Sequence, residues 1–369
     1  MSPLRLHLLY EHGTDGLPFG SASIRLLRPL THPVFQGQLD VTSGPTCDGA
    51  PVDAVIVDRL WRPDISLALA QQLREQASRA GARLLHALDD NFLLLAQERK
   101  DWRPTPDQLQ ALEFFLTESD GIIVTTEPLR DALRAHNAHI TVVPNMLDER
   151  LLVRRGAAPA HSWRQQIARR WAAVLRAVRR RSRPGVVIGY MGTFTHDDDL
   201  LLILPALRAI AQRHGDAVAF ELLGVAAHAQ TRELLAALPV RVLHPPQVAY
   251  TRFMPWFSRM IDWDIALSPL CDTRFNACKS DIKFLDYSAI GAAGIFSRTP
   301  AYAGTVRHGE TGWLVENTPE AWEEALETLI GDAPLRERLA TQATRYLYAE
   351  RIVVRAAEHW LTALEAWLR

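Results

Sequence analysis

The feature that most constrains this fold is an alternation of short apolar runs with segments of helical periodicity, which occurs twice along the chain. Such runs, separated by helical patterns, are typical of buried strands in a parallel sheet. The strands are joined by right-handed crossovers, so the sequence predicts an α/β protein with two Rossmann-like, doubly wound domains facing a cleft. The predicted strands cover residues 4–10, 54–60, 82–88, 121–126 and 140–145 in the first half and 186–192, 217–224, 240–245, 265–270, 292–297 and 312–316 in the second.

The same alternation predicts the domain boundaries. The 369 residues of the chain accommodate two domains, at roughly 150 residues each. We assign residues 1–150 to an N-terminal Rossmann-like domain and residues 185–343 to a C-terminal one, with residues 151–184 as the linker. Residues 344–369 carry apolar side chains at helical spacing, so we expect this last helix to dock on another part of the protein.

The linker is strongly basic. Its sequence HSWRQQIARRWAAVLRAVRRRSRP contains eight arginines and no acidic residue, and its apolar residues follow helical spacing. One interpretation is a basic amphipathic helix, residues 162–183, that meets an anionic surface such as phospholipid headgroups or a lipid pyrophosphate. The alternative is a solvated helix that covers the seam between the two domains.

Composition excludes several classes of protein. A formal net charge of −1 gives no overall attraction to nucleic acid. Three cysteines without a CxxC pattern fit neither a disulfide framework nor a structural zinc site. No apolar run is long enough to span a membrane, and the start, MSPLRLHLLY, lacks the layout of a signal peptide. We therefore expect a soluble, cytoplasmic protein, which the basic linker would make peripheral at the inner face of the membrane.

A glycine turn follows the first predicted strand of the second half, in IGYMGTFTHDDDL. Gly192 lets the backbone approach a ligand closely, and the amides and the Thr193 hydroxyl that follow can face an anion at a helix start. His196 and the aspartates 197–199 then complement the helix dipole. The alternative is an ordinary strand–helix turn. Neither GxGxxG nor GxxxxGK[ST] occurs, which disfavours a dehydrogenase and a P-loop protein.

The stretch KSDIKFLDYSAIGAAG (279–294) combines two lysines and two aspartates with an apolar helix that ends in glycine. Lys283 and Asp286 are three residues apart, so they share one face of a helix. A lysine near a helix start neutralises a diphosphate, and a neighbouring carboxylate accepts hydrogen bonds from ribose hydroxyls. Asp281 or the backbone near Ser280 then contacts a sugar. The alternative is a surface lysine–aspartate pair, which contributes at most about 1 kcal/mol.

Residues 264–315 resemble the donor-binding region of GT-B glycosyltransferases of family 4, the group 1 type. In that family an acidic residue followed by x-x-A-x-G leads into an apolar strand, a loop and DGETGLLV. The matching positions here are Asp286, Ala289, Gly291 and HGETGWLV at 308–315. The resemblance implies a nucleotide diphosphate sugar as donor substrate, retention of anomeric configuration, no metal and no cofactor. It also implies that the last helix crosses back to the N-terminal domain.

The chain also departs from the family pattern. Cys278 stands where the E-x7-E motif has its first glutamate, and the usual Arg and Lys after the glycine turn are absent. In bacterial polysaccharide and O-antigen glycosyltransferases, the subgroup that this chain most resembles, KSDxKFLEY stands at this place. That resemblance implies that Lys279, Asp281 and Lys283 contact phosphate and sugar. The family resemblance also places residues 244–270 where the nucleotide base is held, so the backbone of His244 or the next few residues would pair with the base. The alternative is that His244 is an ordinary loop histidine.

In the first half, Asp89, Asp90 and Asn91 follow the strand at 82–88. Adjacent carboxylates at the C-terminal edge of a sheet suit an acceptor hydroxyl. The alternative is that these residues cap the next helix. A metal would need further ligands, and no DxD motif occurs in a donor-binding context, so we expect no metal site.

Two further segments of the first half bear on the acceptor. Gly20 and Ser21 lie in a glycine-rich segment that resembles the first loop of the GT-B N-terminal domain, which borders the acceptor and the diphosphate. Arg59 ends its predicted strand and points toward the cleft if that strand is central.

We therefore predict a glycosyltransferase that moves a sugar from a nucleotide diphosphate donor to a hydroxyl of a glycan or lipid-linked glycan, in bacterial surface polysaccharide or glycoconjugate synthesis. Asp89 and Asp90 act on the acceptor, and Lys283 stabilises the leaving diphosphate. The predicted donor-binding residues are Gly192, Thr193, His244, Lys279, Ser280, Asp281, Lys283 and Asp286, and the predicted acceptor-side residues are Gly20, Ser21, Arg59 and Asn91.

Two alternatives remain open. A GT-B sugar-nucleotide epimerase or hydrolase would need an acid and a base near the sugar, and only Asp281 and His196 offer themselves. A non-catalytic GT-B nucleotide-binding partner protein is suggested by the missing motif glutamate and the missing Arg/Lys pair.

Overall fold

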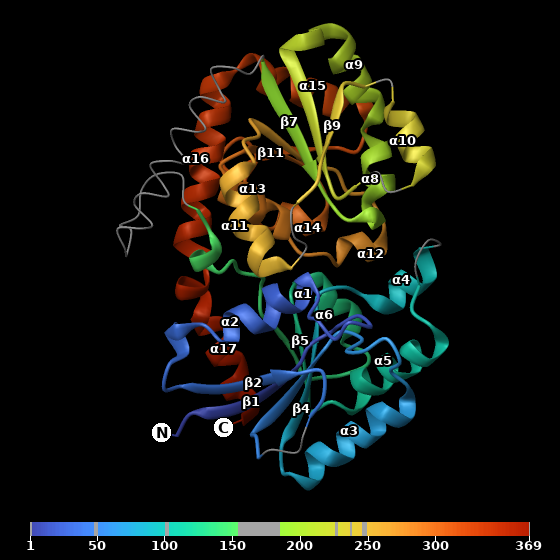
Figure 1. The fold of residues 1–369 in the computed structure, drawn as a ribbon, viewed down its shortest axis with the longest axis vertical. Coiled ribbons are helices and arrows are strands. Elements are labelled where there is room, and N and C mark those ends of the chain that lie inside the picture. Colours follow the sequence, from blue (N-terminus) through green and yellow to red (C-terminus); the bar gives the residue numbers. More distant parts are fainter. Residues whose placement is uncertain are drawn as a thin grey trace. The chain divides into compact units, whose positions relative to one another are not determined.

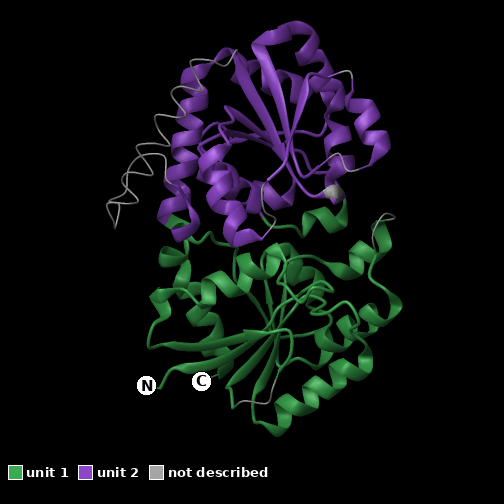
Figure 2. Cartoon of the chain, in the orientation of Figure 1, with its two compact units in different colours: residues 1–149, 273–280, 350–369 green, residues 150–272, 281–349 purple. Residues whose placement is uncertain are grey.

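The computed structural model describes residues 2–47, 51–99, 103–153, 185–225, 228–236, 238–245 and 249–368. The chain divides into two compact units (Figure 2). Unit 1 consists of Met1–Glu149, Thr273–Ser280 and Glu350–Arg369, and unit 2 of Arg150–Asp272 and Asp281–Ala349. The basic helix expected over 162–183 lies outside the described residues.

Unit 1 is built on a six-stranded sheet in the order β2-β1-β3-β4-β5-β6, in which every neighbouring pair is parallel (Figure 1). Its strands are β1 (Leu4–Leu9), β2 (Leu39–Gly44), β3 (Ala54–Asp58), β4 (Arg83–Leu88), β5 (Gly121–Val124) and β6 (Ile140–Val142). The strand order reverses between β1 and β3, and ligands of doubly wound sheets bind at such a reversal, beyond the C-terminal ends of the strands. The edge strand β2 was not predicted, because its residues are at most half-buried and form no apolar run.

The helices of unit 1 cover both faces of this sheet. One face packs against α17 (Val353–Leu368) in a cluster that includes Leu8, Ile56 and Trp360. The other packs against α3 (Leu67–Arg79) and α5 (Pro106–Glu118) in a cluster that includes Val57 and Phe115. The remaining helical segments are α1 (Gly20–Ala22), η1 (Ser23–Leu27), α2 (Arg28–Leu30), η2 (Pro33–Phe35), α4 (Phe92–Glu98), α6 (Glu127–Leu133) and α12 (Arg274–Ala277).

Unit 2 contains a second six-stranded parallel sheet, in the order β12-β11-β10-β7-β8-β9. Its strands are β7 (Val186–Met191), β8 (Val218–Leu223), β9 (Val240–Leu243), β10 (Ile265–Ser268), β11 (Ala293–Ser297) and β12 (Trp313–Val315). Here the order reverses between β7 and β10, so a ligand site is expected at the ends of these two strands. The prediction of two doubly wound, Rossmann-like domains is confirmed.

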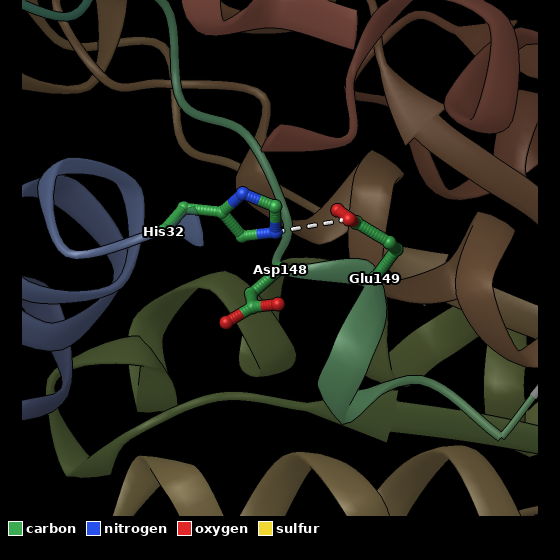
Figure 3. A group of neighbouring side chains, drawn as sticks. All are labelled: His32, Asp148 and Glu149. Atoms are coloured by element: carbon green, nitrogen blue, oxygen red, sulfur yellow. Dashed lines mark hydrogen bonds and ion pairs between the residues drawn. The ribbon is translucent and has the colours of Figure 1, made fainter. Parts of the chain in front are cut away.

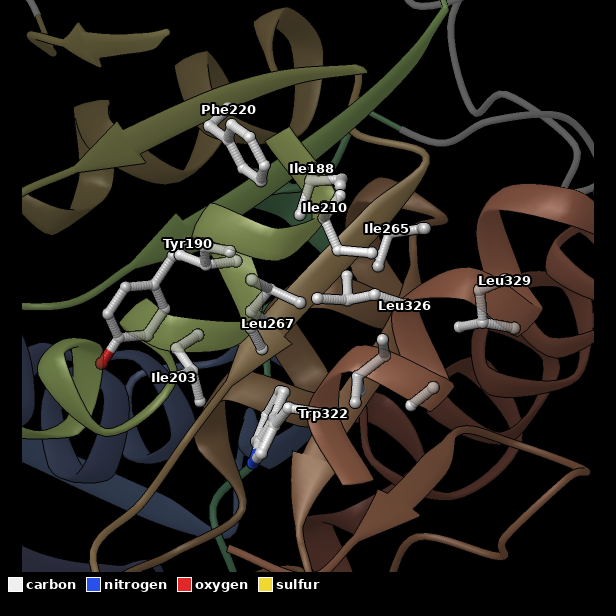
Figure 4. Packing of buried hydrophobic residues seen from close by; sticks show 14 of the residues in the cluster. Ile188, Tyr190, Ile203, Ile210, Phe220, Ile265, Leu267, Trp322, Leu326 and Leu329 are labelled. Carbon is white, nitrogen blue, oxygen red and sulfur yellow. The ribbon is translucent and has the colours of Figure 1, made fainter. Parts of the chain in front are cut away.

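One face of this second sheet packs against α9 (Leu204–His214) and α15 (Pro319–Gly331). Figure 4 shows this core, in which Ile188, Phe220 and Leu267 of the strands meet Ile210 and Leu326 of the helices. The remaining helical segments are η4 (Phe194–His196), α8 (Asp197–Leu202), η5 (Gly215–Ala217), α10 (Ala229–Leu235), α11 (Tyr250–Met260), α13 (Ile282–Ile290), α14 (Pro300–Ala303) and α16 (Ala333–Glu350).

The end of the chain forms two helices where the sequence predicts one over 344–369. α16 ends at Glu350, Ile352 forms a β-bridge with Leu147, and α17 begins at Val353 within unit 1. Within the described residues, no helix combines the length and the apolar composition that crossing a membrane requires.

Candidate functional site

The glycine turn after β7 is tightly built. The Gly192 amide donates to the Leu223 carbonyl at 3.0 Å, and a Cβ on Gly192 would lie 2.8 Å from Val225 Cγ1. Gly224, with φ +75°, would bring a Cβ within 2.2 Å of the Gly192 carbonyl oxygen. Only glycine therefore fits at Gly224, and a side chain at Gly192 would require Val225 to move. The next residue, Thr193, is exposed, and its hydroxyl hydrogen bonds that of Thr195 at 2.8 Å.

Asp199, expected as a helix-start acid, is 4% exposed and joins the loops after β7 and β10. Its carboxylate is 2.7 Å from Nδ1 of His196 and accepts the Cys271 amide at 2.7 Å. Burial by itself would raise the pKa of Asp199, but the hydrogen bond from His196 and the positive charges of His196 and Lys283 lower it to about 2. The sequence did not predict this bridge at the reversal of strand order.

Lys283 and Asp286 lie on α13 and are 8% and 6% exposed. The expectation of a shared helix face agrees with this placement, and burial rules out the alternative of an exposed surface pair. The Lys283 ammonium lies 5.1 Å from the ring centroid of Tyr190. Burial raises the pKa of Asp286 to about 7, although the charge of Lys283 acts in the opposite direction. Oδ1 of Asp286 has no hydrogen-bond partner among the described residues.

A hydrogen-bonded layer fixes the strand ends beneath this pair. The Tyr287 hydroxyl donates to the Leu267 carbonyl at 2.7 Å and accepts the Met191 amide at 3.2 Å, which joins β10 to β7. The hydroxyls of Ser268 and Tyr302 are 2.6 Å apart. These fully buried groups are satisfied, so they rigidify the base of the site.

The predicted donor-binding residues do not all lie at the ends of β7 and β10 in unit 2. Asp281 is buried at the N-cap position of α13, as the sequence position implies. His244 is exposed and follows the edge strand β9, which β8 separates from β7. Lys279 and Ser280 belong to unit 1. There Lys279 Nζ is 3.3 Å from Asp90 Oδ1, and Ser280 Oγ accepts from Asn145 at 2.9 Å.

In unit 1, Arg59 organises the strand ends at the reversal of strand order. Its backbone has φ +50°, a left-handed conformation that a side chain rarely adopts and that occurs preferentially at functional sites. Its Nε lies 3.1 Å from Glu11 Oε2 and 3.5 Å from Asp89 Oδ1, and its Nη1 donates to Ser21 Oγ at 2.8 Å. The guanidinium also lies 4.8 Å from the centroid of the Phe92 ring. Burial would lower the pKa of Arg59, but the carboxylates of Glu11 and Asp89 outweigh burial and raise it.

Several members of this cluster were not predicted from the sequence. Asp58 is fully buried, and burial together with the charge of Glu11 raises its pKa to about 7. His86 lies beneath it in the sheet with Nε2 2.9 Å from the Arg59 carbonyl oxygen, and burial lowers its pKa to about 4. Arg25 is 3% exposed and donates to the Ile123 carbonyl at 3.3 Å. The one sequence feature that could have indicated this cluster is the pair Asp58-Arg59 near the end of the otherwise apolar run 54–60.

The three residues that follow β4, Asp89 to Asn91, have different roles. Asn91 caps α4, because its Oδ1 accepts the Leu94 amide at 3.1 Å. The capping alternative therefore applies to Asn91, whereas Asp89 and Asp90 face Arg59 and Lys279. Gly20, at the start of α1, is exposed, and its neighbour Ser21 contacts Arg59.

A second cluster in unit 1, shown in Figure 3, has the composition of a metal site: His32, Asp148 and Glu149. Nδ1 of His32 accepts the Val34 amide at 3.1 Å, so the proton of the neutral ring is on Nε2, which faces Glu149 at 3.0 Å. Asp148 accepts from Arg28 at 2.7 Å. Neither ring nitrogen offers a lone pair to an ion. The cluster is better described as a His32–Glu149 hydrogen bond beside an Arg28–Asp148 ion pair.

Two parallel α/β units, each with a polar site at the reversal of strand order, define the GT-B class of fold, and solved structures share it. HepE of Anabaena, solved with UDP-glucose and with UDP and glucose, is 12% identical, covers 98% of this chain and 100% of its own, and has a TM-score of 0.65. A glycosyltransferase of Rickettsia africae is 11% identical over 100% of this chain and 99% of its own, with a TM-score of 0.66. Sucrose-phosphate synthase of Thermosynechococcus elongatus is 15% identical over 98% of each chain, with a TM-score of 0.67.

At such low sequence identity, structural similarity shows the fold alone. The family is assigned from a sequence match instead. Residues 185–332 match the family described as glycosyl transferases group 1. This segment is a domain of the glycosyl transferases group 1 family, and the prediction made from the motifs is confirmed for it. A comparison with curated proteins found no match.

Proposed function

We propose that this enzyme transfers a sugar from a uridine diphosphate sugar to a hydroxyl group of an acceptor. The similar fold of HepE, which was solved with UDP-glucose, supports uridine as the base. The family resemblance supports transfer with retention, without a metal, onto a glycan or lipid-linked glycan of a bacterial surface polysaccharide.

The observation that carries the proposal is the buried Lys283–Asp286 pair of unit 2. A buried carboxylate with an unused acceptor costs free energy, and a ligand that donates a hydrogen bond recovers it. The vicinal hydroxyls of a ribose are such donors. Lys283, three residues earlier and within the first turn of α13, would then face the diphosphate, where the helix dipole adds to its charge.

In the chemical step the acceptor oxygen bonds to the anomeric carbon and the bond to the diphosphate breaks. Retention requires the acceptor to approach from the face that the diphosphate leaves. Lys283 and the amides near Gly192 and Thr193 would stabilise the charge that develops on the leaving diphosphate. Asp281 would contact the sugar. His244 is left as a candidate for the base on sequence grounds.

The acceptor side is proposed for unit 1. Asp89 and Asp90 would accept the proton or the hydrogen bond of the reacting hydroxyl. Arg59 already faces Glu11 and Asp89, so we assign it to orienting Asp89. Gly20 borders the same segment as Ser21, which Arg59 contacts.

Release of nucleotide from four donors tests the function. UDP-glucose, GDP-mannose, dTDP-glucose and CMP-sialic acid are each incubated with the enzyme and a panel of methyl glycosides. We expect release of UDP alone, and Lys283→Met to reduce it. Turnover of another nucleotide, or equal rates for Lys283→Met and wild type, would contradict the proposal.

A second candidate function is nucleotide binding without catalysis. It is suggested by Cys278, which replaces a motif glutamate and packs with Leu95 and Leu129 in an apolar cluster of unit 1. A non-catalytic nucleotide-binding protein would bind UDP but release none from UDP-glucose with any acceptor. The same experiment separates the two functions.

A further inference from the structure

Residues 273–280, which we call the strap, lie between β10 and α13 in the sequence but belong to unit 1. Sequence proximity to Lys283 and Asp286 suggests that the whole stretch serves the donor. The strap and α13 belong to different units, because unit 2 resumes at Asp281 (Figure 2).

The strap is anchored along its whole length to unit 1. At its start, Arg274 Nε and the Phe275 amide both donate to the Glu98 carboxylate, each at 3.0 Å. At its end, the Thr126 hydroxyl donates to the Cys278 carbonyl at 2.8 Å. Phe275 and Cys278 are buried in the apolar cluster that also contains Phe92 of α4. These contacts fix the backbone before Lys279, and after it the Ser280 hydroxyl accepts from Asn145 at 2.9 Å.

This anchoring places Lys279 against the acceptor carboxylates. Its ammonium is 3.3 Å from Asp90 Oδ1 and 4.6 Å from the ring centroid of Phe275. The side chains of Lys279 and Asp90 are 20% and 22% exposed, so water screens the pair only in part. The preceding carboxylate, Asp89, has its own cation in Arg59, at 3.5 Å. Two adjacent carboxylates are thus each held by a cation from a different part of the chain.

We propose that Lys279 is a positioning residue for the acceptor, which holds the carboxylate of Asp90 toward the reacting hydroxyl, and that it does not bind the donor diphosphate. The inference rests on the proposed function. Arg59 and Lys279 each already pair with a carboxylate, Asp89 and Asp90. The acceptor site would therefore recognise a neutral hydroxyl group and not an acceptor phosphate. The donor phosphates are left to Lys283.

Two variants of Lys279 and one control test the assignment. Lys279→Met removes the charge, and Lys279→Arg keeps it. Arg79→Met, the control, removes an exposed cation of unit 1 that pairs with Glu75 on α3. UDP binding is measured by calorimetry. Initial rates of UDP release are measured with UDP-glucose and methyl β-D-glucoside as probes, varying the glucoside.

We expect Lys279→Met to keep its UDP affinity within about twofold and to lose about tenfold in kcat/KM for the glucoside, since an interaction with a charged partner is worth roughly that factor. Lys279→Arg should recover most of the loss, and Arg79→Met should match wild type. A loss of UDP affinity in Lys279→Met, or an unchanged kcat/KM, would overturn the assignment. Absence of UDP release by wild type with UDP-glucose would instead contradict the proposed function, and with it the inference.

Discussion

The two sheets end in polar sites of opposite construction. In unit 2, one lysine and one aspartate on a single helix are buried together, and an oxygen of Asp286 has no hydrogen-bond partner among the described residues. In unit 1, Glu11, Arg59 and Asp89 come from three strand ends and pair with one another. Within the same part of the chain, Oδ1 of Asp58 in unit 1 also lacks a hydrogen-bond partner, so the difference lies in the charges. In unit 2 only the charge of Lys283, among the residues described, acts on Asp286, whereas in unit 1 several charges hold one another in place.

Two carboxyl groups with similar pKa values show the same contrast. Burial raises the pKa of both Asp58 and Asp286 to about 7. Around Asp58 the neighbouring charges are mixed, with Glu11 raising and Arg25 lowering its pKa. Around Asp286 only Lys283 opposes burial. A ligand that donates hydrogen bonds to Asp286 would therefore change its ionisation strongly.

The largest predicted effect concerns Asp286 and pH. The folded protein, with a pKa of about 7 for this group, holds its proton more tightly than the unfolded chain, whose value is 3.8. Stability therefore falls as pH rises from about 4 to about 7. Asp286→Asn removes this loss, so its stability relative to wild type should rise by up to about 4 kcal/mol between pH 4 and pH 8. Urea unfolding at both pH values measures this gain, and a difference independent of pH would contradict it.

Arg59→Met tests the paired site of unit 1. It leaves Glu11 and Asp89 without their cation in a largely buried place. We expect a loss of about 3 kcal/mol, near the lower end for breaking a buried pair because Glu11 can take up a proton. Arg62→Met, which removes an exposed pair with Asp64, is the control. Equal unfolding midpoints for the two variants would show that the cluster does not stabilise unit 1.

Lys283→Met tests the site of unit 2 by activity. Loss of one group that stabilises charge on the leaving diphosphate should reduce kcat by about a hundredfold. Arg213→Met in the same unit, an exposed residue that pairs with Glu323 outside the donor-binding region, should leave the rate of UDP release unchanged. A rate for Lys283→Met within a factor of two of wild type would remove Lys283 from the chemistry.

The smallest effect is expected at Asn91. Asn91→Ala removes the cap of α4 and should cost about 1 kcal/mol in stability. Asn91→Asp keeps a capping oxygen and should cost less. If thermal unfolding shows the same midpoint for both, the capping hydrogen bond contributes nothing to stability.

Much of the fold could be predicted because its strands are buried on both faces and read as apolar runs. β2 was missed because its side chains are partly exposed, and the helix over 344–369 proved to be two because the chain pairs with Leu147 at Ile352. Local spacing also placed Lys283 and Asp286 on one helix.

The spacing of residues along the sequence could not show which unit each residue belongs to. Lys279 is four residues from Lys283, yet it belongs to the other unit. Asp58 lies within the apolar run 54–60 and Glu11 directly follows the run 4–10, and neither belongs to a recognisable motif. Their roles follow from strand order, which brings the ends of β1 and β3 together and which no local pattern encodes.

Calorimetric titration of UDP into wild type, Lys283→Met and Arg59→Met tests most directly whether the two sites have different roles. We predict that wild type binds UDP, that Lys283→Met binds it at least tenfold more weakly, and that folded Arg59→Met binds it as wild type does. Equal affinity of wild type and Lys283→Met, or a loss in Arg59→Met alone, would contradict the division into a ligand-binding site in unit 2 and a side-chain-positioning site in unit 1.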